Sequence, residues 1–472
     1  MSKHEYLYDR KGPWPQPNPA HPFGEAPAVV HIPGKEKRTW WWNIGLRYMR
    51  DMITYWPVAL WKAWKDSSWE ILSDETFCDQ IYTTPLSKFL NPKIDDNLLE
   101  IFKKQLKEQE KEEEFFIADF YCMKDVVPFD GMYVASTVVL FKRDQVNDVL
   151  NVLAIYFYEN EVLFTPEDGD AWNLAKNYAM MGATYRILLS VHPILHFPFD
   201  TVNAITKTSL PMNSTLFKLL YPHFQFTLVL NNTVLESSTS PVANHQVFIF
   251  SGFTGPQEGL ETLLVSGYQG YKGNSSFPKY TWTMTPQKIY GEYHVFLMNY
   301  YDVFKKFTSG VVEQIPKSEY PEIAKWAQYI SDWLPGFPNG VEIFKEDNLA
   351  GVLAKVMWDL SVAHATDHHS YGTIPINRLP LRMRVPPPVK KDDTFKRKDQ
   401  AHFGDIFRYA VEWKMFFTDT TVTRLMDVDY KFPTPQLQKL QSNFIQDLIE
   451  VDKNMPVKNF MKLENIAVSI QY

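Results

Sequence analysis

The sequence predicts a mainly α-helical fold built around one central pair of helices, with small β-hairpins or a small sheet in the N-terminal third. The first observation is two histidine pairs of equal spacing, His192 with His196 and His364 with His368. Residues four apart lie on one face of an α-helix, one turn from each other. The second observation is the helical spacing of apolar residues from Asp170 onwards, and the third is strand-like alternation before it.

The first 38 residues are expected to form an extended arm on the surface. They are rich in proline, which fixes the backbone and lacks the N–H group that a helix interior needs. Residues 39–472 contain no obvious linker, so we expect a single domain there. The start of the chain lacks the apolar segment of a secretory signal, and no apolar run is long enough to span a membrane. We therefore expect a cytoplasmic protein.

Tryptophan is concentrated in residues 40–69, where seven Trp are interleaved with Arg47, Lys62 and Lys65. The apolar positions of this stretch recur at helical spacing. One interpretation, which we favour as the more common, is a helix whose Trp face packs on the core. The other is an interfacial helix that contacts a membrane peripherally and collects lipid.

The rest of the N-terminal third mixes a charged helix with short apolar runs. Residues 98–114 predict a helix that ends in a solvated acidic run. Residues 115–127 and 132–143 resemble strands or buried segments. Residues 149–166 alternate around a turn at 159–160, which predicts a β-hairpin.

Helical spacing continues from Asp170 through the first histidine pair. Residues 240–290 are rich in Gly, Ser, Thr and Pro, so loops with short elements are expected there. Residues 375–393 form a Pro-rich loop. Further apolar or helical stretches are predicted at residues 216–235, 290–312, 320–333, 348–365 and 436–449.

The composition excludes some classes of function. The chain has 472 residues and a formal net charge of −7, without a basic stripe that would indicate nucleic-acid binding. Its two cysteines, Cys78 and Cys122, are too few for a disulfide framework. Neither is near a histidine pair in the sequence, so a thiolate metal ligand is not expected.

Four histidines on two helices predict a metal site inside a helical core. Neutral imidazole suits iron, manganese, copper or zinc. A structural zinc site is disfavoured because such sites usually include cysteine. The residues that flank both pairs are apolar. A buried redox metal beside an apolar cavity fits the oxidation of an apolar substrate, so we predict a non-haem metal oxygenase.

Six blocks, in the order of the chain, resemble the catalytic domain of the lipoxygenase family, and the resemblance covers roughly residues 69–472. One block alone would be weak, but six in sequence are specific. The blocks are DETFCDQIYTTPLSKFLNP (74–92), FTPEDGDAWNLAKNY (164–178), VHPILH (191–196), LFKLLYPHF (216–224), HATDHHSYG (364–372) and INRLP (376–380).

This resemblance implies a helical domain around one non-haem iron per chain, or alternatively manganese, without the N-terminal PLAT β-sandwich. The implied ligands are His192, His196, His364, His368 and the C-terminal carboxylate, which here belongs to Tyr472. Beyond these ligands, the resemblance implies no catalytic group other than a metal-bound hydroxide.

The implied reaction takes a hydrogen atom from a CH₂ group between two double bonds of a polyunsaturated fatty acid. Dioxygen then adds to give a hydroperoxide. A second hypothesis is an oxidase or oxygenase of the same type that acts on a different apolar specialised metabolite. A third is a non-catalytic relative that binds an apolar ligand, and the intact histidine set argues against it.

Two departures from the family concern the metal ligands. The family's first pair is usually five apart on a helix widened by a π-type turn, whereas His192 and His196 are four apart and Pro193 follows the first directly. We therefore expect either a regular helix or a different distortion at this pair. The chain also extends beyond AVSI, which resembles the family's ending, by Gln471 and Tyr472.

Other departures concern the surroundings of the metal. Val234 aligns with the family residue that directs oxygen to one end of the substrate, and Leu188 and Tyr371 align with glutamines that link the two ligand helices. These positions indicate a changed substrate or oxygen channel. His223 is expected to be structural. Asp200 is expected either to orient an imidazole or to be an ordinary surface or capping carboxylate.

Overall fold

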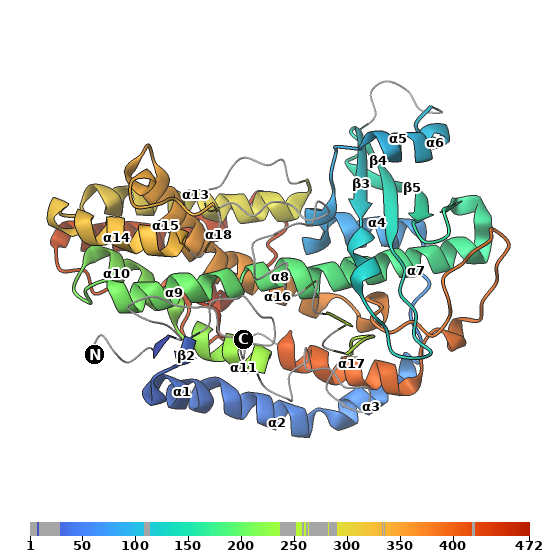
Figure 1. Cartoon of the computed structure of the whole chain (residues 1–472), viewed down its shortest axis with the longest axis horizontal. Helices are drawn as coiled ribbons and strands as arrows, with labels where there is room; N and C mark the ends of the chain where they lie inside the picture. The colour runs from blue at the N-terminus through green and yellow to red at the C-terminus, as the bar shows by residue number, and fades with distance from the viewer. Residues whose placement is uncertain are drawn as a thin grey trace.

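The computed structural model confirms a mainly helical protein with a four-stranded antiparallel sheet in its N-terminal third (Figure 1), and two short strands near the start of the chain pair with each other. Most of the expected arm and most of the loop segment 240–290 lie outside the described residues. The structure describes residues 7–8, 29–107, 114–236, 252–256, 259–260, 263, 282, 290–332, 334, 336–417 and 421–472.

A helical rod runs through the middle of the molecule (Figure 1). Nearly every side chain of its first helix is buried, as expected of a helix surrounded by other elements. Its buried Lys176 is satisfied by Asp74, whose carboxylate accepts a hydrogen bond of 2.6 Å. The rod consists of α7 (Gly169–Arg186), a π-helical turn (Ile187–Val191), α8 (His192–Ile194) and α9 (Phe197–Ser209).

A second helical line carries the other histidine pair alongside the rod (Figure 1). Every side chain of its first two segments is buried except that of Asn348, which is half-buried. Helix α13 (Glu292–Glu313) packs against this line, and α18 (Pro435–Lys453) packs against α13. The line consists of α15 (Asn348–Trp358), a π-helical turn (Asp359–Ala363) and α16 (His364–Thr373).

The sheet is a four-stranded antiparallel meander of β3, β4, β5 and β6. The hairpin predicted over residues 149–166 is confirmed as β5 and β6. The helix predicted over residues 98–114 is described as far as Lys107, and it ends before Glu114, which already begins a strand. The strands are β3 (Glu114–Asp119), β4 (Thr137–Asp144), β5 (Val149–Phe157) and β6 (Val162–Phe164), and the charged helix is α5 (Asp96–Ile101) followed by α6 (Lys103–Lys107).

The Trp-rich segment forms a layer along one side of the molecule, below α17 in Figure 1. The extended segment was predicted to continue to residue 38, but helix α1 already begins at Gly34. Pro33 is the last proline of that segment, so the residues after it are free to form a helix. The favoured interpretation, a Trp face packed on the core, is wrong. Five of the seven Trp are exposed, and small side chains such as Ala59 and Ala63 face inward. The layer consists of α1 (Gly34–Trp40), a π-helical turn (Trp41–Gly45), α2 (Leu46–Thr54) and α3 (Trp56–Lys65).

Helix α17 (Phe403–Phe416), which supports this layer, was not predicted from the sequence. None of the described helices is long and apolar enough to cross a membrane. The predicted helices over 290–312, 320–333 and 436–449 are confirmed with shifted ends. The remaining elements are β1 (Leu7–Tyr8), β2 (Val29–His31), α4 (Asp74–Tyr82), α10 (Thr215–Leu220), α11 (Thr227–Glu236) and α14 (Tyr320–Ser331).

Two large hydrophobic clusters meet where the histidines lie. Ile187 and Leu189, before the first pair, belong to the cluster that surrounds α7 and the sheet. Leu195 and Phe199 belong to the cluster around α9, α13 and α15. The rod therefore passes from one core into the other at His192, which buries the histidines without placing them at the centre of either core.

Candidate metal centre

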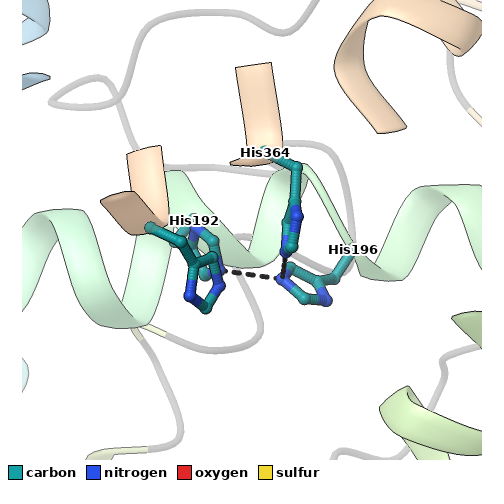
Figure 2. A group of neighbouring side chains, drawn as sticks. His192, His196 and His364 are labelled. Atoms are coloured by element: carbon teal, nitrogen blue, oxygen red, sulfur yellow. Dashed lines mark hydrogen bonds between the residues drawn. The ribbon is translucent and has the colours of Figure 1, made fainter. Parts of the chain in front are cut away.

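All four histidines of the two pairs come together in one cluster. The Nε2 atom of His196 lies 2.8 Å from that of His192 and 3.1 Å from that of His364. The Nε2 atom of His368 lies 2.8 Å from that of His192. One potential ligand atom from each ring falls within 4.8 Å of all the others. The rings of His192, His196 and His364 point toward one another in Figure 2.

The first pair lies at a distortion of the rod that differs from the expectation. A π-helical turn, Ile187–Val191, directly precedes His192, although the spacing of the pair argued against the family's widened helix. Pro193 explains it, because its ring has no N–H group and pushes away the carbonyl four residues before it. After the proline the helix tightens, and His196 N donates to the carbonyl of Pro193 at 3.0 Å.

The second pair follows another π-helical turn, Asp359–Ala363, and then sits on a regular helix. Single π-turns inside α-helices occur frequently at functional sites. Within this turn the Ser361 hydroxyl donates to the carbonyl of Met357 at 2.6 Å. The side chain of His364 is completely buried, and that of His368 is nearly so.

The arrangement fits a single metal ion. Two imidazole nitrogens about 2.1 Å from one ion and at a right angle are separated by about 3.0 Å, close to the contacts measured here. Burial lowers the pKa of His196 to about 4 and, together with the neighbouring histidines, holds the pKa of His192 and His364 well below the usual value. These three rings are therefore neutral at physiological pH, which is the form that binds metal.

His196 is oriented by a chain of buried polar groups. Its Nδ1 lies 2.9 Å from Oδ1 of Asn231, and Nδ2 of the same amide donates to the Asp200 carboxylate at 2.7 Å. Because the amide nitrogen faces Asp200, the amide oxygen faces His196 and must accept a hydrogen bond from its Nδ1–H group. Nε2 then keeps its lone pair for a metal. The prediction that Asp200 orients an imidazole is refined: it acts through Asn231.

A buried ion pair lies beside the second histidine pair. Lys88 donates to the completely buried Asp367 carboxylate at 2.6 Å, and the Tyr293 hydroxyl donates to the same carboxylate. The positive charge of Lys88 is also one cause of the lowered pKa of His192. Neither this ion pair nor the role of Asn231 was predicted from the sequence. Two features of the sequence could have indicated these residues. Asp367 is the one carboxylate within HATDHH, and Asn231 follows an apolar run.

The C-terminal residue reaches the cluster. Tyr472 is buried, and its ring centre lies 5.6 Å from that of His364 and 5.2 Å from that of His368. Backbone N–H groups of Val422 and Thr423 donate to the Gln471 side chain, at 2.6 Å and 3.1 Å. The tail beyond AVSI is thus folded into the site.

His223 anchors the same tail. Its Nδ1 donates to the carbonyl of Val468 at 2.8 Å, and its Nε2 accepts from the Tyr430 hydroxyl at 2.9 Å. Burial lowers the pKa of His223 to about 3, so the ring is neutral and matches this pattern of one donor and one acceptor. The predicted structural role of His223 is confirmed.

The two predicted channel residues lie near the cluster but outside it. Leu188 is in the π-helical turn before His192, half-buried against the core around α7. Val234 is in α11, three residues after Asn231, and its side chain lies outside the described residues. Tyr371, at the end of α16, is buried against Phe417 at a ring separation of 5.9 Å.

Comparisons with known proteins agree on one family. No family model matches the chain. It is 23% identical over 396 residues to the polyunsaturated fatty acid lipoxygenase ALOX12 of Mus musculus, which covers 76% of this chain and 58% of that protein. The chain therefore spans less than two thirds of the length of that curated relative.

Solved structures match nearly the whole chain. The manganese lipoxygenase of Gaeumannomyces graminis has a TM-score of 0.70 at 14% identity, and the match covers 100% of this chain and 96% of that one. A lipoxygenase in complex with arachidonate has a TM-score of 0.71 at 14% identity, covering 99% and 80%. These matches show that the chain has the lipoxygenase fold, and the four-histidine cluster lies within it.

Proposed function

We propose that the chain is a non-haem iron dioxygenase that converts a polyunsaturated fatty acid into a hydroperoxide. The convergence of four imidazoles, three of them buried, within 4.8 Å is the observation that carries this proposal. The similarity to curated polyunsaturated fatty acid lipoxygenases and to a lipoxygenase crystallised with arachidonate supports the choice of substrate class.

In this proposal the metal ligands are His192, His196, His364, His368 and the terminal carboxylate of Tyr472. A bound redox metal supplies one-electron oxidation of a C–H bond between two double bonds. The burial of Tyr472 against the rings of the second pair supports its inclusion. Manganese is the alternative metal, because a manganese lipoxygenase is among the structures that this fold matches along its whole length.

The protein groups around the metal have separate tasks. The chain of Asn231 and Asp200 fixes the tautomer of His196, so that this ring always presents its lone pair. The two hydrophobic clusters pack on either side of the histidines along the rod. Leu188 and Val234 are proposed to line the path of substrate or oxygen.

A second candidate is oxidation of a different apolar metabolite by the same centre. It is favoured by two side chains that replace the family's glutamines between the ligand helices. Leu188 is apolar and lies in the π-helical turn before His192, and Tyr371 is a large aromatic residue completely enclosed by protein three residues after His368.

Incubation of purified, iron-loaded protein with linoleate separates these candidates. The fatty-acid proposal predicts growth of the absorbance of a conjugated diene and one dioxygen consumed per product. A matched sample of the His364→Ala variant should show neither. Bound iron without diene formation would favour the second candidate, and a well-folded protein that binds no metal would overturn both.

A further inference from the structure

An apolar surface follows the layer formed by α1, the first π-helical turn, α2 and α3, which we call the Trp arm (residues 34–65). Figure 1 shows the arm along one side of the molecule, with α11 and α17 between it and the rod. Its inner face is formed by buried residues such as Trp40, Ile44, Ala59 and Ala63. The arm is therefore fixed on one side by packing, and its opposite side faces outward.

The outward side of the Trp arm carries large hydrophobic side chains. Trp64 is 74% exposed, Trp42 70%, Ile53 66% and Trp61 54%. Scattered exposed apolar residues are normal, but a contiguous group of this size usually marks an interaction site. Spacings of three, four and seven residues place most of them in one stripe along the arm. The stripe comprises Trp42, Met49, Ile53, Trp56, Leu60 and Trp64, with Trp41, Val58 and Trp61 beside it.

The charges of the Trp arm are almost all positive, although the whole chain has a net charge of −7. Residues 35–65 contain seven basic and two acidic residues. Both acidic residues are paired: Glu36 with Lys207 at 3.3 Å, and Asp51 with Arg50 at 2.9 Å.

The basic residues are placed along the exposed apolar stripe. The Lys65 ammonium group lies 5.2 Å from the centre of the Trp61 ring, so this lysine extends along an exposed aromatic face. The exposed charged side chains of the arm are all basic, namely Lys35, Lys37, Arg38, Arg50 and Lys65.

We propose that the Trp arm docks the protein onto an anionic lipid bilayer, lying flat in the interface. Trp is the residue most typical of the boundary between lipid headgroups and acyl chains. An amphipathic helix with Trp and Leu on one side and Lys and Arg around it is the usual interfacial element. Each basic residue near the surface adds attraction to anionic headgroups.

A second copy of the chain fits this surface less well. A symmetric dimer through the arm would place the same basic residues of two chains against each other, and like charges in contact oppose association. Docking to lipid is also separate from the proposed chemistry, because none of the four histidines of the cluster lies in the arm.

Vesicle sedimentation tests the proposal. Full-length protein is mixed with vesicles of phosphatidylcholine, with and without phosphatidylglycerol, and the bound fraction is measured. The variant Trp42→Ala/Trp61→Ala/Trp64→Ala removes most of the apolar area that enters the interface. Its affinity for vesicles that contain phosphatidylglycerol should therefore fall by about tenfold or more. Trp40 is left in place because it is buried.

Three controls make the test specific. Val127→Ala/Val146→Ala/Val341→Ala removes exposed apolar side chains away from the arm and should bind like the wild type. Lys35→Glu/Lys37→Glu/Arg38→Glu should lose the preference for phosphatidylglycerol while keeping the weaker binding to phosphatidylcholine. The His364→Ala variant should bind vesicles normally, so a failed metal centre cannot be mistaken for failed docking.

The proposal is overturned if the wild type sediments with neither vesicle, or if the triple Trp variant, with an unchanged melting temperature, binds as the wild type does. It is also overturned if the wild type elutes as a dimer that the triple Trp variant converts into a monomer, because the arm would then be covered by a second chain.

Discussion

The two histidine pairs have the same spacing and each follows a π-helical turn, yet they are held in different ways. The first pair lies where the rod is interrupted by Pro193, and the backbone at His196 has left regular helix geometry with φ −109°. A side-chain relay through Asn231 orients His196 there. The second pair sits on the regular helix α16, beside the buried ion pair of Asp367 and the ring of Tyr472.

This difference shows how one metal geometry can be built on two kinds of support. Where the helix backbone is continuous, it sets the direction of both rings, and neighbouring groups need only to complete the site. Where the helix is interrupted, a hydrogen bond to the ring nitrogen that does not face the metal site orients the imidazole instead. We therefore expect that removing the groups that hold each pair affects metal binding and stability differently at the two pairs.

Removing one ligand should have the largest effect. We expect His364→Ala to lose essentially all bound metal, because it deletes a completely buried ligand that contacts the first pair directly. Metal content of the purified variant is the measurement. His369→Ala, a half-buried neighbour outside the cluster, should keep its metal. Stoichiometric metal in His364→Ala would contradict a four-histidine site.

Blocking the C-terminal carboxylate, which lies beside the second histidine pair, should have the next largest effect on bound metal. A C-terminal tag should strip metal and activity, because it turns the terminal carboxylate of Tyr472 into an amide, whereas an N-terminal tag should not. Tyr472→Phe keeps the carboxylate and should retain its metal. Equal metal content in the two tagged proteins would rule out the carboxylate as a ligand.

The ion pair beside the second pair should affect stability more than metal binding. Asp367→Asn leaves the partly buried Lys88 without its partner and should lower the free energy of unfolding by about 3–5 kcal/mol. The matched control is Asp447→Asn, which breaks the largely exposed pair with Lys306 and should cost about 0–1 kcal/mol. Chemical denaturation of metal-free protein measures both. Similar losses in the two variants would mean that the buried pair has no special role.

The relay at the first pair should give the smallest of these effects. Asn231→Leu keeps the volume but frees the His196 ring, so metal affinity should fall by about 10–100-fold. Thr233→Ala, a change at an exposed residue of the same helix, is the control. Competition with a chelator measures the affinity, and an unchanged value for Asn231→Leu would show that the backbone alone orients His196.

The pairing of the histidines could be predicted from the sequence because residues four apart on a helix lie on the same face. The hairpin near residue 160 could also be predicted, because its two strands and its turn are adjacent in the sequence. Helix α17 was missed because it follows a Pro-rich loop and its buried face, with Ile406 and Tyr409, contacts elements distant in sequence. The Trp arm was misjudged because helical spacing identifies a face but not the direction in which it points.

The supports of the site could not be predicted because they are long-range. Asn231 lies 35 residues from His196, and Lys88 lies 279 residues from Asp367. The π-helical turns depend on how Pro193 and the packing around it are accommodated, which sequence spacing does not record. The approach of Tyr472 was expected only from the family resemblance.

Metal content combined with the electron paramagnetic resonance spectrum of the purified wild-type protein tests the central claim most directly. Four imidazoles that converge on one point predict one iron or manganese ion per chain, with a spectrum that His364→Ala abolishes. A correctly folded wild-type protein that takes up neither metal, even when both are supplied in excess, would contradict the account.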